Sequence, residues 1–209
     1  MKARLFLPLA VSVLFALCAV SSNAATTITF DDLSETAQGS LITNAYQGLV
    51  WSNFYANNAI LFTNIHLGLG VDGVLYGMVS ASNVAVNALG NPAEIDSSTS
   101  FNFLSAYLTG VWKSNLNIEV EGFRGPRKLY DTTVVASATN STLFAFNYLN
   151  IDRLYFNSSG GLSAGFPMGG GENFAMDNFT FEFVPEPSTF LLTGAGVLTL
   201  CALRRRKRT

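Results

Sequence analysis

Two glutamates, Glu119 and Glu121, lie two positions apart in the segment LNIEVEGF at residues 116–123. Successive side chains of a β-strand point to opposite faces, so these two carboxylates are expected to share one face. A retaining glycosidase needs such a pair about 5–5.5 Å apart. A solvated strand face explains the same spacing without any chemistry. We therefore predict no catalytic residue in this chain and keep Glu119 and Glu121 as candidate ligand-binding residues.

Aromatic side chains offer a second kind of chemistry, because flat apolar rings can stack on the CH face of a pyranose. The two tryptophans are Trp51 and Trp112. Trp112 follows Gly110 in a turn-like context and precedes Lys113, which favours an exposed ring that could contact a ligand. Core packing accounts for most aromatic residues in a β-protein, and we expect Trp51 in the core.

The single histidine, His66, cannot form a His-rich zinc site. No G-x-S-x-G nucleophile elbow accompanies it, so a serine triad has no support either. We interpret His66 as an ordinary strand-end or loop residue. The sequence predicts that the protein is not an enzyme.

The elements that must position these residues are short β-strands. Alternating runs bounded by Gly, Asn, Ser and Pro recur, and no helical periodicity of useful length interrupts them between residues 26 and 183. The candidate runs are 27–30, 48–54, 59–62, 74–79, 84–88, 100–110, 116–123, 129–138, 150–158 and 173–183. About nine strands rich in aromatic and β-branched residues predict an all-β fold, an antiparallel β-sandwich.

The first 24 residues have the pattern of a secretory signal peptide. Lys2 and Arg4 precede an apolar stretch at 5–20, and small residues allow cleavage after Ala24. The folded domain is then expected at 25–183. Its cysteine content is zero, since Cys18 and Cys201 fall outside it. A disulfide framework and a thiolate metal site are thereby excluded.

The domain at 25–183 is acidic, although the whole chain carries a net charge of only −2. Five basic and thirteen acidic residues give these positions a net charge of −8. A domain of this sign repels phosphate backbones, so nucleic acid is not expected as a partner. The excess of carboxylates favours sites for divalent cations instead.

The C-terminal segment 184–209 combines three features in a fixed order. Pro185, Glu186 and Pro187 come first, an uncharged stretch follows at 190–203, and five basic residues stand at 204–208. A helix over 188–206 would span roughly 28 Å, just enough for a hydrocarbon core of about 30 Å, and the basic end would stay cytoplasmic. This order resembles the PEP-CTERM sorting signal of exported bacterial proteins. The resemblance implies an exosortase as processing partner, transient anchoring in the membrane, and delivery to the cell surface or extracellular matrix.

The phrases ITFDD, YQGLVWSNF, VEGF, IDRLYF and FAMDNFTF resemble β-sandwich domains of exosortase-sorted proteins, which are similar to lectin and carbohydrate-binding jelly rolls. The resemblance implies that the first and last strands pair. It also implies that Asp31, Asp32 and Asp177 meet at that seam and hold a structural Ca²⁺. We therefore expect a protein that binds or is embedded in extracellular polysaccharide. A structural or adhesive matrix protein without a specific ligand and, less readily, a glycoside hydrolase are the alternatives.

Overall fold

Antiparallel strands make up most of the computed structural model, which describes residues 24–33, 39–65, 72–166, 169–185 and 196. Residues Ala24–Phe183 form one compact unit. Its strands are β1 (Thr26–Ile28), β2 (Ser40–Leu41), β3 (Val50–Ser52), β4 (Phe54–Asn58), β5 (Asn83–Asn87), β6 (Ala93–Gly110), β7 (Lys113–Arg124), β8 (Arg127–Ala136), β9 (Thr142–Ser163) and β10 (Phe174–Phe183). Its helices are α2 (Ala59–Ile65), α3 (Gly73–Gly77) and the 3₁₀ turn η1 (Ala88–Gly90).

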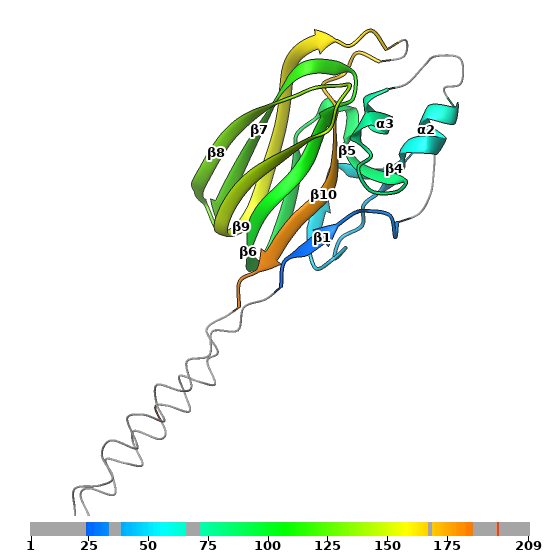
Figure 1. Ribbon diagram of the computed structural model, residues 1–209. Coiled ribbons are helices and arrows are strands. Elements are labelled where there is room, and N and C mark those ends of the chain that lie inside the picture. Colours follow the sequence, from blue (N-terminus) through cyan, green and yellow to red (C-terminus); the bar gives the residue numbers. More distant parts are fainter. Residues whose placement is uncertain (1–23, 34–38, 66–71, 167–168, 186–195, 197–209) are drawn as a thin grey trace, which may run out of the picture. The chain divides into compact units, whose positions relative to one another are not determined.

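The strands pair in the order β2-β4-β5-β10-β6-β9-β7-β8, with β1 added to β10 and β3 added to β6 (Figure 1). Each of these pairings is antiparallel. The predicted adjacency of the first and last strands is confirmed, because Thr26 lies opposite Phe181 and Ile28 opposite Phe179.

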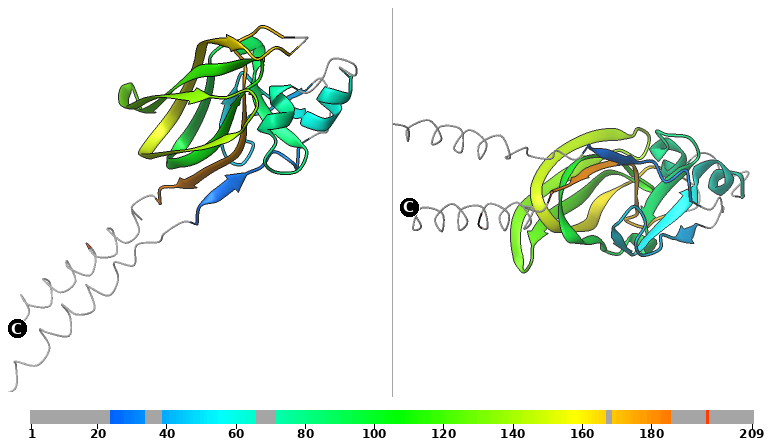
Figure 2. Two further views of the ribbon diagram at one scale, coloured as in Figure 1. Left: turned by 45° about the horizontal axis from the view of Figure 1, so that its top comes forward. Right: turned by 90° about the horizontal axis from the view of Figure 1, so that it is seen from below.

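Two long strands, β6 and β9, each run from one layer of the fold into the other. Residues 93–96 of β6 pair with β3 and with residues 153–156 of β9, in the layer that continues to β7 and β8. After a register shift, β6 pairs with β10 and with the first part of β9, in the layer that holds β5 and β4. The predicted antiparallel β-sandwich is thus confirmed (Figures 1 and 2).

Aromatic rings fill the space between the layers. Phe156 of one layer lies 5.9 Å from Phe54 and 5.8 Å from Phe174 of the other, measured between ring centroids. Trp51 is only 3% exposed and its Nε1 donates to the carbonyl of Tyr46, so its predicted core position is confirmed. Strand β7 alternates as expected, with Leu116, Ile118 and Val120 buried.

Two segments predicted as strands, 59–62 and 74–79, are instead helical over residues 59–62 and 74–77. Asp72 caps α3, since its Oδ1 accepts hydrogen bonds from the backbone N–H groups of Val74 and Leu75. Asn58 performs a similar role for α2 by accepting from the N–H of Leu61. Periodicity does not separate a short apolar run in a strand from one in a helix, which explains the wrong prediction.

The helices cover the outer face of β4, β5 and β10 (Figure 2). A second, smaller hydrophobic cluster lies there, and it consists of Ala59, Val74, Val84, Val86, Val111 and Ala175, with Phe62, Leu75, Met78 and Trp112 packed against it. No helix among the described residues is long and apolar enough to cross a membrane. The stretch 188–206, where a spanning helix is predicted, lies outside the described residues except for position 196.

Candidate functional site

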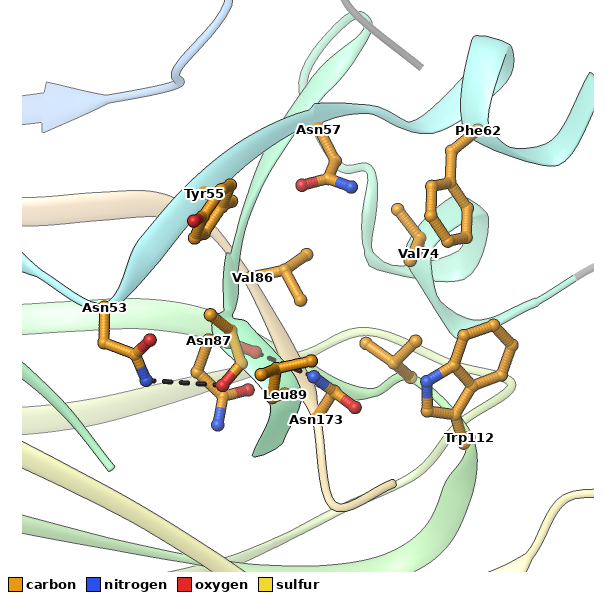
Figure 3. A pocket seen from close by; sticks show the side chains of 12 residues that line it. Asn53, Tyr55, Asn57, Phe62, Val74, Val86, Asn87, Leu89, Trp112 and Asn173 are labelled. Carbon is orange, nitrogen blue, oxygen red and sulfur yellow. Dashed lines mark hydrogen bonds between the residues drawn. The ribbon is translucent and has the colours of Figure 1, made fainter. Parts of the chain in front are cut away.

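A cavity of about 480 Å³ opens beside the smaller hydrophobic cluster, within the range typical of small-ligand sites. It is bounded by the outer face of β4 and β5, by both helices and by the turn between β6 and β7 (Figure 3). Its lining consists of Asn53, Tyr55, Asn57, Phe62, Val74, Val86, Asn87, Ala88, Leu89, Val111, Trp112 and Asn173. We call this cavity the amide–aromatic pocket.

Three aromatic side chains form its walls. Tyr55 projects from β4 and remains 37% exposed, while Phe62 and the half-buried Trp112 face it from the opposite side (Figure 3). The rings of Phe62 and Trp112 are tilted by 46° with centroids 6.3 Å apart. The pocket therefore offers flat apolar surfaces on two sides.

Three of the four asparagines hold the pocket together through bonds to the backbone. Asn53 Nδ2 donates to the carbonyl of Pro92 at 2.9 Å. Asn173 Nδ2 donates to the carbonyl of Asn87 at 2.8 Å. Asn87 Oδ1 accepts from the N–H of Phe174 at 2.7 Å. These bonds tie the residue before β4 to the β5–β6 connection and the end of β5 to the start of β10. They fix one side of the pocket.

The pocket has no charged side chain among its lining residues. The nearest charges in sequence are Lys113, after Trp112, and Glu172, before Asn173. Their Nζ and Oε1 atoms form an ion pair at 3.1 Å. The hydrogen bond from Lys113 lowers the pKa of the half-buried Glu172 carboxyl, so the negative charge of Glu172 is stabilised beside this cation. Such a lining is suited to binding an uncharged polar ligand.

The residues predicted from the sequence are distributed over separate places. Trp112 lines the amide–aromatic pocket, whereas Glu119 and Glu121 lie on β7, in the other layer. Lys128 Nζ lies 2.6 Å from both Glu121 Oε1 and Asp131 Oδ2. Carboxylate oxygens of Glu119, Glu121 and Asp131 lie within 4.8 Å of one another. Glu121 is thus already paired with a cation from its own sheet.

The structure does not bring Asp31, Asp32 and Asp177 together, contrary to the expected calcium site. Among the described residues, the group of three acids close enough to share an ion is the one on β7 and β8, and it contains none of them. Asp31 accepts from the N–H of Asn83, and Asp32 accepts from the hydroxyl of Tyr46.

Asp177 is fully buried in a shell of hydrogen-bond donors. Its carboxylate accepts from the N–H groups of Val79, Ser80 and Asn178 and from the Ser80 hydroxyl, at 2.6–2.9 Å. A cation requires oxygen ligands in these positions, and N–H groups cannot supply them. The geometry therefore gives no support to a calcium ion at this seam.

Sequence reasoning missed most of the pocket. Tyr55 and Asn57 alternate along β4 and share its outward face, and Asn53 stands directly before the strand. An aromatic residue between two asparagines, each two positions away, could have identified these three positions from the sequence. The contributions of Asn87 and Asn173 depend on strand pairing, which the sequence does not show.

Comparisons with known proteins give one sequence match. Residues 183–207 match the PEP-CTERM protein-sorting motif. Pro185 is exposed, and Glu186 and Pro187, like His66, lie outside the described residues. A search of curated proteins gives no match.

Several solved structures match this chain with low similarity. A DUF4465 family protein from Bacteroides ovatus has a TM-score of 0.43 and 10% identity, over 78% of this chain and 90% of that chain. TmCBM61, solved with β-1,4-galactotriose, has a TM-score of 0.34 and 10% identity, over 71% and 99%. A CBM4 structure has a TM-score of 0.33 and 11% identity, over 69% and 99%. At these TM-scores, no ligand is transferred to this chain. The chain combines an antiparallel β-sandwich with a PEP-CTERM protein-sorting motif at residues 183–207.

Proposed function

We propose that this protein is a non-catalytic glycan-binding protein of the cell surface, with the amide–aromatic pocket as its binding site. The observation that carries the proposal is the lining of the pocket, in which Tyr55, Phe62 and Trp112 alternate with amide side chains. Rings of this kind stack on the apolar faces of sugars, and amides match the hydroxyl groups around the sugar rim.

The sorting motif supports a surface location for this activity. A PEP-CTERM motif implies export, a transient membrane anchor and processing by an exosortase. A protein delivered in this way meets extracellular polysaccharide, which has many copies of one repeating unit. A single pocket of modest affinity then suffices, because many protein molecules bind the same polymer.

Binding without hydrolysis is the better match to the side chains present. Glycoside hydrolysis needs two carboxylic groups on either side of the scissile bond, and no carboxylate is among the lining residues of the pocket. The candidate pair on β7 has Lys128 in hydrogen-bond contact with Glu121. This contact occupies the Glu121 carboxylate with a cation of its own sheet.

Isothermal titration calorimetry on the full chain, purified in detergent, tests the proposal. The probes are neutral tetrasaccharides of glucose, mannose and galactose. We expect binding of at least one of them, weakened about tenfold or more by Trp112→Ala. The matched control is Tyr155→Ala, which removes a half-buried ring from β9, outside the pocket. Absence of binding to every neutral probe would favour the alternative of a structural matrix protein without a specific ligand.

A further inference from the structure

Asn57 differs from the other asparagines of the amide–aromatic pocket. It projects from β4 on the same side as Tyr55 (Figure 3) and is only 6% exposed. Its Oδ1 is buried and has no hydrogen-bond partner among the described residues. Its amide packs against Gly39, where a Cβ would overlap it. The chain therefore accommodates this polar group closely without bonding its oxygen.

A buried amide oxygen without a partner destabilises the folded state, because it has lost its bonds to water. Leucine has a similar shape and would avoid this loss, and the neighbouring positions Val74 and Val86 show that apolar residues suit the site. Rotation of the amide about χ2 would turn this oxygen from Gly39 toward the pocket, where a ligand hydroxyl supplies the missing bond. Burial, position in the lining and the unpartnered oxygen thus agree.

The geometry points to Asn57 as the residue that selects the ligand, by exchanging hydrogen bonds with a hydroxyl group of an uncharged sugar. This inference rests on the proposed function. An amide both donates and accepts, and a hydroxyl group does the same, so the two are complementary. A sugar carboxylate or sulfate at this position would be buried without a cation, since Lys113 is paired with Glu172. The pocket accordingly binds neutral sugars and rejects uronic acids.

The deciding variant is Asn57→Leu in the full chain, purified in detergent. We expect its affinity for the best neutral tetrasaccharide to fall at least tenfold in titration calorimetry. We also expect its melting temperature without ligand to remain equal to that of the wild type or to rise. Asn57→Ala serves as a second variant, with the same loss of affinity and no bulk added beside Gly39.

Asn83 provides a matched control. Its Oδ1 is also buried without a partner, but its Nδ2 donates to the carbonyls of Phe30 and Leu33 at 3.0 and 3.1 Å. It does not line the pocket. Asn83→Leu should therefore lower the melting temperature and leave the affinity unchanged. A melting temperature that is unchanged or raised by Asn57→Leu and lowered by Asn83→Leu distinguishes a ligand-binding amide from a structural one.

Four other outcomes would each contradict part of the inference. Equal affinity of wild type and Asn57→Leu overturns the role of Asn57 and leaves the glycan-binding proposal standing. A fall in melting temperature at Asn57 as large as that at Asn83 assigns Asn57 a structural role. Tighter binding of tetragalacturonate than of any neutral probe overturns the selection for uncharged sugars. No binding by the wild type removes the proposed function and this inference with it.

Discussion

Gly169 lies directly against the indole ring of Trp112, so close that a Cβ on residue 169 would overlap the ring atoms Cδ2 and Cε3. One surface of the indole is thereby covered by backbone, while the pocket side faces Phe62. Only glycine leaves room for the indole ring at this position. It holds the ring in the orientation that the amide–aromatic pocket needs.

Gly169→Ala is expected to weaken sugar binding about tenfold or more, because the methyl group must displace the Trp112 ring. Titration calorimetry with the neutral tetrasaccharides measures the effect. Gly170→Ala is the control, since a Cβ at that position has no atom within 4 Å. Equal affinities of the two variants would show that the position of the ring does not matter.

Asp177 gives a prediction about pH. Burial raises the pKa of its carboxyl above the 3.8 that is ordinary for aspartate, against the opposing effect of its hydrogen bonds. The folded state then holds the proton more tightly than the unfolded chain. The stability contributed by Asp177 is therefore full below the ordinary pKa and decreases as pH rises through the raised value.

Asp177→Asn isolates this effect. The variant places an Nδ2 donor among the N–H groups of Val79 and Ser80, and we expect it to lose about 2 kcal/mol of stability. The difference between wild type and variant should shrink as pH rises from 4 to 7 and then level off. Urea denaturation across that range measures it. A difference that grows with pH would mean that the hydrogen bonds outweigh burial.

Phe103 is at the centre of the ring network in the core, with centroids of Phe146 and Phe179 both 4.8 Å away. Phe103→Ala should destabilise the domain by about 3–5 kcal/mol, because the cavity cannot close around so many rings. Leu143→Ala, at a position that is 51% exposed, should change stability by less than about 0.5 kcal/mol. Denaturant midpoints of the two variants give the comparison.

Processing of the tail can be tested in the cell. Mass spectrometry of surface-associated protein should find no peptide from 190–203, because cleavage near Pro185, Glu186 and Pro187 removes them. Glu186→Ala should block this cleavage, so that the tail is retained. Ser188→Ala is a nearby control and should be cleaved like the wild type. An intact tail on mature wild-type protein would contradict the sorting hypothesis.

The β-sandwich could be predicted because its signal is local. Alternation in 116–123 and in the other long strands follows directly from burial of one face, and it appears in the sequence as it appears in the structure. The apolar run 59–62 carried no such information. What made it helical was the amide of Asn58 and a packing surface on β5, and neither is visible in the run itself.

The amide–aromatic pocket was harder to predict than the fold, since its parts are joined only by strand pairing. Trp112 was singled out from its turn context, but Asn57 and Asn173 are 116 residues apart and meet through β5 and β10. The expected calcium site failed for a different reason. The predicted adjacency of β1 and β10 is confirmed, but the carboxylate of Asp177 accepts hydrogen bonds from the backbone N–H groups of residues 79 and 80.

Strand β10 begins directly after Asn173 of the pocket and ends at Phe183, where the sorting motif starts. Its ten residues, about 33 Å in extended form, therefore connect the amide–aromatic pocket to the segment that carries the sorting motif. A force applied between the pocket and residue 183 would run lengthwise along this strand, which pairs with β6 on one side and with β5 and β1 on the other. Both rows of hydrogen bonds would be loaded together in shear and could not open one by one. The pairing of β10 therefore resists separation of the pocket from the C-terminal end of the domain.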